Sequence, residues 1–184
     1  MNILVFGAQG SGKGTHAKYI ADKLGVPYIG AGDLFRELEK EKSPKGEKIR
    51  ELIARGIIIP NELSVPAFRQ YLKKFDVSDG VVLDGYPRNL DQARNLPIKL
   101  DLIVHITLPE NVAIRRLMKR KRCDDTPGAI KQRLTLFRKS TKPVYDYFKG
   151  EGVKIVKIDN FPPVEEVQRE IDELLKQPRN KNNG

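Results

Sequence analysis

Residues 7–15, which read GAQGSGKGT, combine glycines and a lysine at a spacing typical of a loop that binds phosphate. Gly7, Gly12 and Lys13 fit the pattern G-x-x-x-x-G-K. In this pattern the glycines let backbone N–H groups turn toward an oxyanion, and the lysine reaches the β- and γ-phosphates of a nucleotide. The hydroxyl residue that usually follows the lysine comes one position late, as Thr15. We therefore expect this segment to hold the phosphate chain of a nucleotide.

Asp84 is the second candidate for chemistry, because it directly follows the continuous apolar segment 80–83. Such a segment is typical of a buried parallel strand, and ligands bind at the carboxyl ends of these strands. A carboxylate there is costly to bury unless it meets a cation, and Mg²⁺ held largely through water fits that need. Asp-Gly-x-Pro is also common in turns, so a turn cap is the alternative for Asp84 taken by itself.

Arginines form the third group. Transfer of a phosphoryl group between nucleotides requires neutralisation of several negative charges and little covalent work from the protein. The forked guanidinium of arginine grips phosphate oxygens in pairs. The candidates lie near interruptions of the regular pattern and are Arg36, Arg88, Arg120, Arg122 and Arg133.

The elements that would position these residues alternate along the chain. Strands are expected at 2–6, 26–29, 80–83, 102–108 and 153–158. Helices are expected at 13–24, 33–38, 61–75, 109–118, from 129 past 148, and 163–176, with a helix-turn-helix on the surface between them at 37–56. Alternation of this kind predicts an α/β fold with a parallel sheet between two helical layers.

Two stretches interrupt the alternation, at about 30–60 and 119–130, and both follow strand ends on the expected ligand side. They are candidate inserts that cover a substrate. The apolar segment Ile57-Ile58-Ile59-Pro60 is too short and too apolar for an ordinary surface loop, so we expect it to line a site. The tail 177–184 has no apolar residue and is expected to be disordered.

Composition limits the kinds of partner and the cellular compartment that we expect for the protein. Lys and Arg outnumber Asp and Glu by 34 to 24, which gives a net charge of +10 and favours polyanionic partners such as nucleotides or nucleic acid. No apolar run approaches the ~18 residues that a membrane span needs, and no secretory signal follows Met1. With Cys123 as the sole cysteine, these features predict a cytoplasmic protein without a disulfide.

Five blocks together resemble the adenylate kinase family of nucleoside monophosphate kinases. They are GAQGSGKGT, GAGDLFR at 30–36, GIIIP at 56–60, LDGYPRNLDQA at 83–93, and RCDD with IKQRL at 122–134. The resemblance implies a three-layer P-loop NTPase fold with a five-stranded parallel sheet, in one kinase domain over 1–176. It further implies a core of 1–29, 61–118 and 130–176, a helical insert for the nucleoside monophosphate at 30–60, and a very short lid at 119–129.

The resemblance also implies reversible transfer of the γ-phosphate of Mg-ATP to AMP, which gives two ADP. Lys13, Arg88, Arg122 and Arg133 would be catalytic. ATP would lie against Gly10, Ser11, Gly12, Lys13, Gly14 and Thr15, with Arg120 stacked on its base. AMP would lie against Ala31, Arg36, Ile57, Ile59, Gly85 and Arg88, with Gln92 reading the edge of its base. Asp84 would hold Mg²⁺, the cofactor, through water.

Three departures from the family pattern stand out. Ala31 replaces the usual threonine of T-G-D, which removes a hydroxyl near the AMP base. Gln9 replaces a proline in the phosphate loop. The lid between Arg120 and the helix that follows is reduced to about nine residues, Lys121 to Ala129.

Other functions remain open at this point. The loop by itself also suits GTPases, motors and transport ATPases, although a GTPase would carry an Asn-Lys-x-Asp base reader and the Asn-Lys pair here falls in the polar tail. A UMP/CMP kinase is the near alternative, against which Gln92 and Ile59 count. A nucleic-acid-associated ATPase is suggested by the net charge and by RRLMKRKR at 115–122. We expect no nucleic-acid partner and no contact with a membrane. A homo-oligomer is compatible with the sequence, because some relatives of archaeal type resemble trimers.

The short lid generates a prediction about donor selectivity. A lid excludes water and adds contacts to the donor base, and few residues remain here to do so. Turnover measured with ATP, GTP, CTP and UTP, each with AMP, should therefore differ modestly. A preference for ATP above ~100-fold over every other donor would contradict this expectation, because that ratio requires dedicated contacts to the base.

Overall fold

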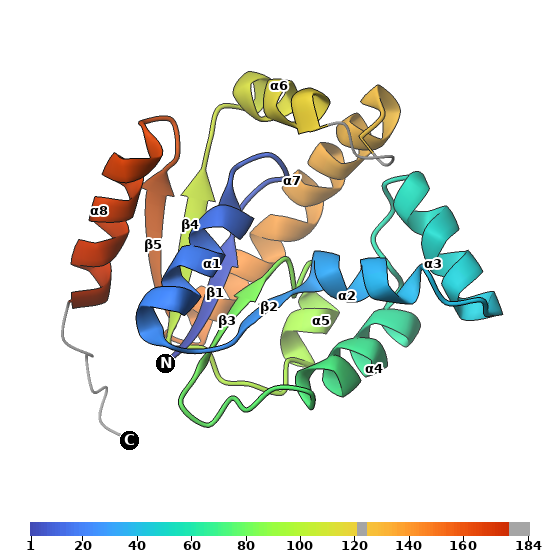
Figure 1. The fold of residues 1–184 in the computed structure, drawn as a ribbon, viewed down its shortest axis with the longest axis horizontal. Helices are drawn as coiled ribbons and strands as arrows, with labels where there is room; N and C mark the ends of the chain where they lie inside the picture. Colours follow the sequence, from blue (N-terminus) through green and yellow to red (C-terminus); the bar gives the residue numbers. More distant parts are fainter. Residues whose placement is uncertain (121–124, 177–184) are drawn as a thin grey trace.

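The structure, a computed structural model, describes residues 1–120 and 125–176. Five parallel strands form one sheet in the order β2-β3-β1-β4-β5 (Figure 1). The strands are β1 (Asn2–Phe6), β2 (Tyr28–Gly30), β3 (Val81–Asp84), β4 (Leu102–Thr107) and β5 (Lys154–Asp159). The predicted α/β class with a five-stranded parallel sheet is confirmed. Arg122 and the tail 177–184 lie outside the described residues.

The helices follow the predicted sequence of elements with small differences in their bounds. They are α1 (Lys13–Leu24), α2 (Ala31–Leu38), α3 (Pro44–Ala54), α4 (Asn61–Leu72), α5 (Leu90–Arg94), α6 (Glu110–Arg120), α7 (Pro127–Gly150) and α8 (Val164–Lys176). Strand β2 starts two residues later than predicted, and α4 ends three residues earlier. Helix α5 was not predicted, because five residues are too few to show helical periodicity; the Asn89 side chain caps it by accepting from Gln92 N.

The alternation of side chains along β1 assigns the helices to the two faces of the sheet. Ile3 and Val5 belong to a buried cluster with α1 and α8, whereas Leu4 and Phe6 belong to a second cluster with α4 and α7. Figure 1 shows α1 and α8 on one side of the sheet and α7 on the other. Successive side chains of a strand point to opposite faces, so the five-residue apolar run is buried on both sides. The sheet and the helices on its two faces therefore form three layers.

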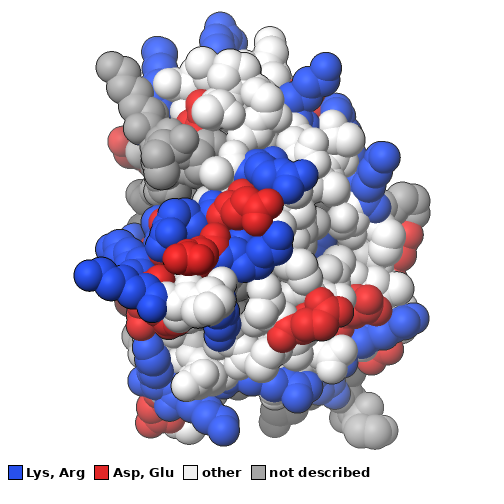
Figure 2. All heavy atoms as spheres, turned by 90° about the vertical axis from the view of Figure 1, so that its right-hand side faces the viewer, with Lys and Arg blue, Asp and Glu red and all other residues white. Residues whose placement is uncertain are grey.

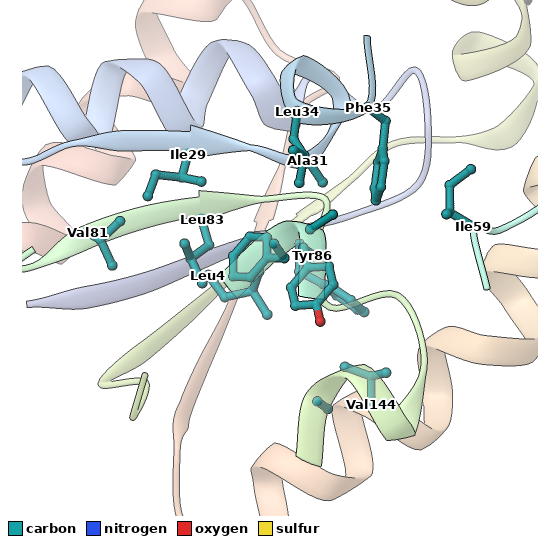
Figure 3. Packing of buried hydrophobic residues seen from close by; sticks show 14 of the residues in the cluster. Leu4, Ile29, Ala31, Leu34, Phe35, Ile59, Val81, Leu83, Tyr86 and Val144 are labelled. Carbon is teal, nitrogen blue, oxygen red and sulfur yellow. The ribbon is translucent and has the colours of Figure 1, made fainter. Parts of the chain in front are cut away.

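The second cluster fixes the carboxyl end of β3 in place. Phe68 of α4 is fully buried and stacks on Tyr86, with ring centroids 3.9 Å apart and an interplanar angle of 10°. Figure 3 shows Leu83 and Tyr86 packed between Ala31 of α2 and Val144 of α7. Tyr86 is 1% exposed. It is therefore a core aromatic.

No helix within the two described ranges is long and apolar enough to cross a membrane.

We expect Phe68→Ala to lower the free energy of unfolding by about 3–5 kcal/mol, because it removes a fully buried ring and leaves a cavity beside Tyr86. Urea denaturation at equilibrium measures this change. Phe161→Ala is the matched control: its ring is 63% exposed, so its effect should stay within about 0.5 kcal/mol. Equal effects of the two substitutions would contradict the assignment of Phe68 to the core.

Candidate active site

A cavity of about 950 Å³ opens at the carboxyl ends of β1 and β3. It is bounded by the phosphate loop, by α2, by residues 56–59, and by parts of α6 and α7. Thirteen of the predicted site residues line it, and they are Gly10, Gly12, Lys13, Gly14, Thr15, Arg36, Ile57, Ile59, Asp84, Gly85, Arg88, Arg120 and Arg133. The segment 57–59, which we expected to line a site, does so. The lining thus joins residues that are more than 100 positions apart in the sequence.

The phosphate loop leaves β1 and enters α1 through glycines with unusual backbone angles. Gly12 precedes α1 with φ 88°, a left-handed conformation that favours glycine. A Cβ at this position would also meet the Asn160 side-chain amide. Lys13 folds back so that its Nζ lies 3.4 Å from Ala8 O. The loop therefore presents the N-terminus of α1 and one ammonium group to the cavity, which suits an anion.

Asp84 ends β3 between two neighbouring strands, opposite Val5 of β1 and Gly30 of β2. The Tyr28 hydroxyl donates to Asp84 Oδ2 over 3.2 Å. A Cβ on Gly14 would lie 3.1 Å from the same oxygen, so the carboxylate borders the phosphate loop, as expected. Asp84 Oδ1 is buried and has no hydrogen-bond partner among the described residues. A carboxylate with one free oxygen beside a phosphate loop fits a metal ion held through water.

Two arginines approach the cavity from the side of α2. Arg36 forms an ion pair with Asp33 at 2.6 Å. Arg88 donates from Nε to Gly85 O over 2.8 Å. Burial lowers the pKa of Arg88, the positive charges of Arg133 and Arg36 lower it further, and Asp84 opposes the shift. These charges make an anionic ligand favourable at this end of the cavity.

Ala31, Ser11 and Gln92 are predicted site residues that do not line the cavity. Ala31 and Ser11 are fully buried. Gln92 is 2% exposed, and both ends of its amide have partners: Oε1 accepts from Arg88 N over 2.7 Å, and Nε2 donates to Ser64 Oγ over 3.0 Å. Gln92 thus supports the backbone of Arg88 in this arrangement, and its role as a reader of the AMP base stays a prediction.

Asp125 holds two of the predicted arginines together. Its side chain is 1% exposed and pairs with Arg120 at 2.7 Å and with Arg133 at 3.2 Å. Arg120 grips the carboxylate with two donors, since its Nε also lies 2.8 Å from Oδ2. A carboxylate that is shared in this way offsets the repulsion between two guanidinium groups. It keeps both near the same part of the cavity.

Arg116, Asn160 and Tyr28 also line the cavity, and the sequence analysis did not single them out. Arg116 belongs to the basic run at 115–122, where six basic residues in eight concealed which of them faces the site. Asn160 directly follows β5, so its place at a strand end was a usable signal. Tyr28 carried no comparable signal, because an aromatic at the start of a strand is common in cores.

His16 of α1 is 1% exposed and lies below the loop, with Nε2 2.8 Å from Asn160 Oδ1. Burial lowers the pKa of His16 below 6.5; the hydrogen bond to Asn160 opposes this shift, and the charge of Arg116 adds to it. The folded protein therefore favours the neutral imidazole.

The fold and this cavity define a class of protein: a P-loop nucleotide-binding α/β protein in which a second group of arginines faces the phosphate loop. The family model of adenylate kinases matches residues 5–153. An adenylate kinase of Cyanothece sp. is 34% identical and covers 95% of each chain. One of Kosmotoga olearia is 32% identical over 93% of this chain and 97% of its own, and one of Methanosarcina barkeri is 30% identical over 96% and 99%.

The chain belongs to the adenylate kinase family. The resemblance drawn from the five sequence blocks is thereby confirmed.

The buried neutral histidine generates a prediction about pH. Because the folded-state pKa of His16 is below the ordinary 6.5, its contribution to stability is complete above that pH and is lost as the pH falls through the folded-state pKa. Between about pH 7.5 and 5.5 the free energy of unfolding should therefore fall less in His16→Gln than in the wild type.

Urea denaturation at several pH values measures this difference. The carboxylates are common to both proteins, as is His105, whose pKa burial also lowers, so they cancel in the comparison. Parallel pH curves for the two proteins would show that His16 titrates alike in the folded and unfolded states.

Proposed function

We propose that the protein transfers the γ-phosphoryl group of ATP to AMP, reversibly, with two ADP as products. The observation that carries this proposal is that the phosphate loop and the Arg36–Arg88 pair open into the same cavity. One anion site next to a helix N-terminus and a second one lined by arginines suit two phosphate chains placed end to end. Membership of the adenylate kinase family supports the same reaction.

On the donor side, the backbone N–H groups of Gly10 to Thr15 would surround the β-phosphate and Lys13 would follow the transferred group. The Lys13 ammonium lies 3.4 Å from Ala8 O, and we propose that it moves from the loop backbone toward the phosphate when a nucleotide binds. The side chain of lysine is long and flexible enough for this movement and carries its charge at one point. Ser11 is fully buried, and its N–H donates to Ala8 O over 3.2 Å, so its part would be to hold the loop in shape.

Arg133 and Arg120, together with Arg122, would stabilise the phosphoryl group during its transfer. The resemblance implied a base-stacking role for Arg120, but its guanidinium shares the carboxylate of Asp125 with Arg133, which favours a role at the phosphates. Arg116, which lines the cavity next to Asn160, is then the better candidate for contact with the donor base. Phosphate oxygens would replace the Asp125 carboxylate as partners of these arginines.

The free oxygen of Asp84 suits Mg²⁺ held through water, as the resemblance implied. When bound, Mg²⁺ would neutralise charge on the donor phosphates. The chain's own part is to keep the carboxylate fixed: the Tyr28 hydroxyl holds Oδ2 at 3.2 Å and leaves Oδ1 for the water shell. Gly14 leaves room for this arrangement, because a larger residue would crowd Oδ2.

On the acceptor side, Arg36 and Arg88 would hold the AMP phosphate, while Ile57, Ile59 and Gly85 would border the base. Gln92 would have to give up its bond to Ser64 in order to read the base edge while it still supports Arg88. Ala31 adds no hydroxyl beside the base. Residues 30–60, with α2 and α3, would form the acceptor insert and residues 119–129 the short lid of one kinase domain.

A nucleic-acid-associated ATPase is not favoured. On the face shown in Figure 2, positive and negative side chains lie interleaved, and α3 on this face carries the Lys48–Glu51–Arg55 ion pairs. Such pairs lower the field that a polyanion would meet. We also propose a cytoplasmic location, on the grounds of the one cysteine. A homo-oligomer stays a prediction.

The direct test supplies Mg-ADP as the only nucleotide and follows the appearance of ATP and AMP. Both should form, because the proposed transfer is reversible, and in equal amounts, because each transfer between two ADP molecules leaves one ATP and one AMP. Steady release of phosphate that RNA stimulates would instead support the ATPase alternative. UMP in place of AMP, with Mg-ATP as donor, tests the UMP/CMP kinase alternative.

Arg36→Ala provides the matched variant for this test. Loss of a charge-assisted contact to phosphate should raise the KM for AMP by about 10- to 100-fold and leave the affinity for ATP unchanged. Arg55→Ala is the control, since Arg55 lies on the same insert, is 63% exposed and pairs with Glu51 away from the cavity. Equal effects of the two variants would contradict the acceptor role of Arg36.

A further inference from the structure

We infer that Asn160 and His16 are positioning residues that hold the phosphate loop in the shape that binds the donor. The inference rests on the proposed function of the loop as the donor site. It concerns residues to which neither the sequence blocks nor the family resemblance gave a role.

Asn160 stands where four elements meet. Its backbone N donates to Thr107 O over 2.9 Å, which fixes it to the end of β4. Its side-chain Nδ2 donates to Ser11 O in the phosphate loop over 2.6 Å. Its Oδ1 lies 2.8 Å from His16 Nε2 on α1. Arg116 on α6 donates to its backbone O over 3.2 Å. Because Asn160 is 6% exposed, these bonds compete little with water.

The chemistry of the groups fixes the direction of each bond. Ser11 O is a carbonyl and can only accept, so the amide nitrogen of Asn160 must face it. The amide oxygen of Asn160 then faces His16, and Nε2 of the imidazole must carry the proton. The result is an ordered chain in which His16 donates to Asn160 and Asn160 donates to the loop.

This chain sets the orientation of one peptide group in the loop. In a trans peptide the C=O and the following N–H point in opposite directions. A bond that holds Ser11 O toward Asn160 therefore aims Gly12 N–H away from Asn160, where it is free to contribute to the anion site. The glycine itself fits this arrangement, because any Cβ at position 12 would meet the Asn160 amide. Loop and Asn160 are thus matched in shape as well as in hydrogen bonding.

Binding measurements on the full-length protein test the inference, with calorimetry of Mg-ATP and of inorganic tripolyphosphate as probes. Asn160→Ala should weaken both by about tenfold, the effect of one lost hydrogen bond of about 1.4 kcal/mol. AMP binding should change by less than about twofold, since the acceptor arginines are not part of the chain of bonds. In steady-state assays the KM for ATP should rise more than kcat falls.

His16 offers a matched pair of variants that keeps the test valid if Asn160→Ala folds poorly. In His16→Gln the amide nitrogen reaches the place of Nε2 and can still donate to Asn160, whereas in His16→Asn the shorter amide reaches only the place of Nδ1. We therefore expect His16→Asn to weaken ATP and tripolyphosphate binding by a factor of several, and His16→Gln to recover most of that loss. Thermal unfolding of each variant reports on folding separately.

Two results would overturn the inference. Unchanged affinity for both probes in Asn160→Ala and His16→Asn would show that the loop keeps its shape without the chain of bonds. Weaker binding of ATP with unchanged tripolyphosphate would show that Asn160 contacts the nucleoside directly and does not act through the loop. Because the calorimetry needs no AMP, it stays informative if the wild type binds ATP yet forms no ADP, the result by which the proposed function would fail.

Discussion

Repulsion between cations around one cavity is the constraint on which the rest of the structure depends. Lys13, Arg36, Arg88, Arg116, Arg120 and Arg133 all line this cavity. Carboxylates divide the charge into local groups, because Asp33 pairs with Arg36 and Asp125 with both Arg120 and Arg133. These side chains come from the start of α1, from α2, from the segment after β3, and from α6 and α7, so the packing of these elements keeps the cations closer together than their repulsion favours. Nucleotide phosphates would add anions to this excess of positive charge. Holding the cations together is costly for the protein by itself, and function requires that cost.

Those parts of the structure that depend on local pattern could be predicted from the sequence. The apolar run of β1 and the glycine loop behind it predicted the strand, the turn and the start of α1, because each depends on residues within a few positions. The sheet followed from alternation of strands and helices. Asp84 beside the loop followed from the rule that ligands bind at strand ends, and the Gly14–Asp84 approach gives a physical reason for the displaced hydroxyl at Thr15.

What could not be predicted depends on contacts between distant segments. Asn160 meets Ser11 across 149 positions and His16 across 144, and no pattern within either segment records that pairing. Gln92 is occupied by Arg88 N and Ser64 Oγ because α5, a helix of one turn, packs beside α4; neither the helix nor this contact has a periodic signal. Among the basic residues of α6, the rotation of the helix about its axis determines that Arg116 and Arg120 face the cavity.

The two sides of the cavity differ in how they are held, and this difference bears on the reaction. The side that we propose for the donor is tied to the sheet through the Thr107–Asn160–Ser11 connection. On the side that we propose for the acceptor, Asp33 pairs with Arg36, and between α6 and α7 Asp125 pairs with Arg120 and Arg133. Carboxylates thus occupy arginines that phosphate would need. Such pairs hold the guanidinium groups close to their working positions, and a phosphate that arrives exchanges one anion for another with little reorganisation. The same exchange lowers the affinity for the phosphate, because each arginine–carboxylate ion pair must break before the phosphate can bind. This arrangement suits the very short lid that we propose, since arginines already held in place need less enclosure to act on the phosphoryl group.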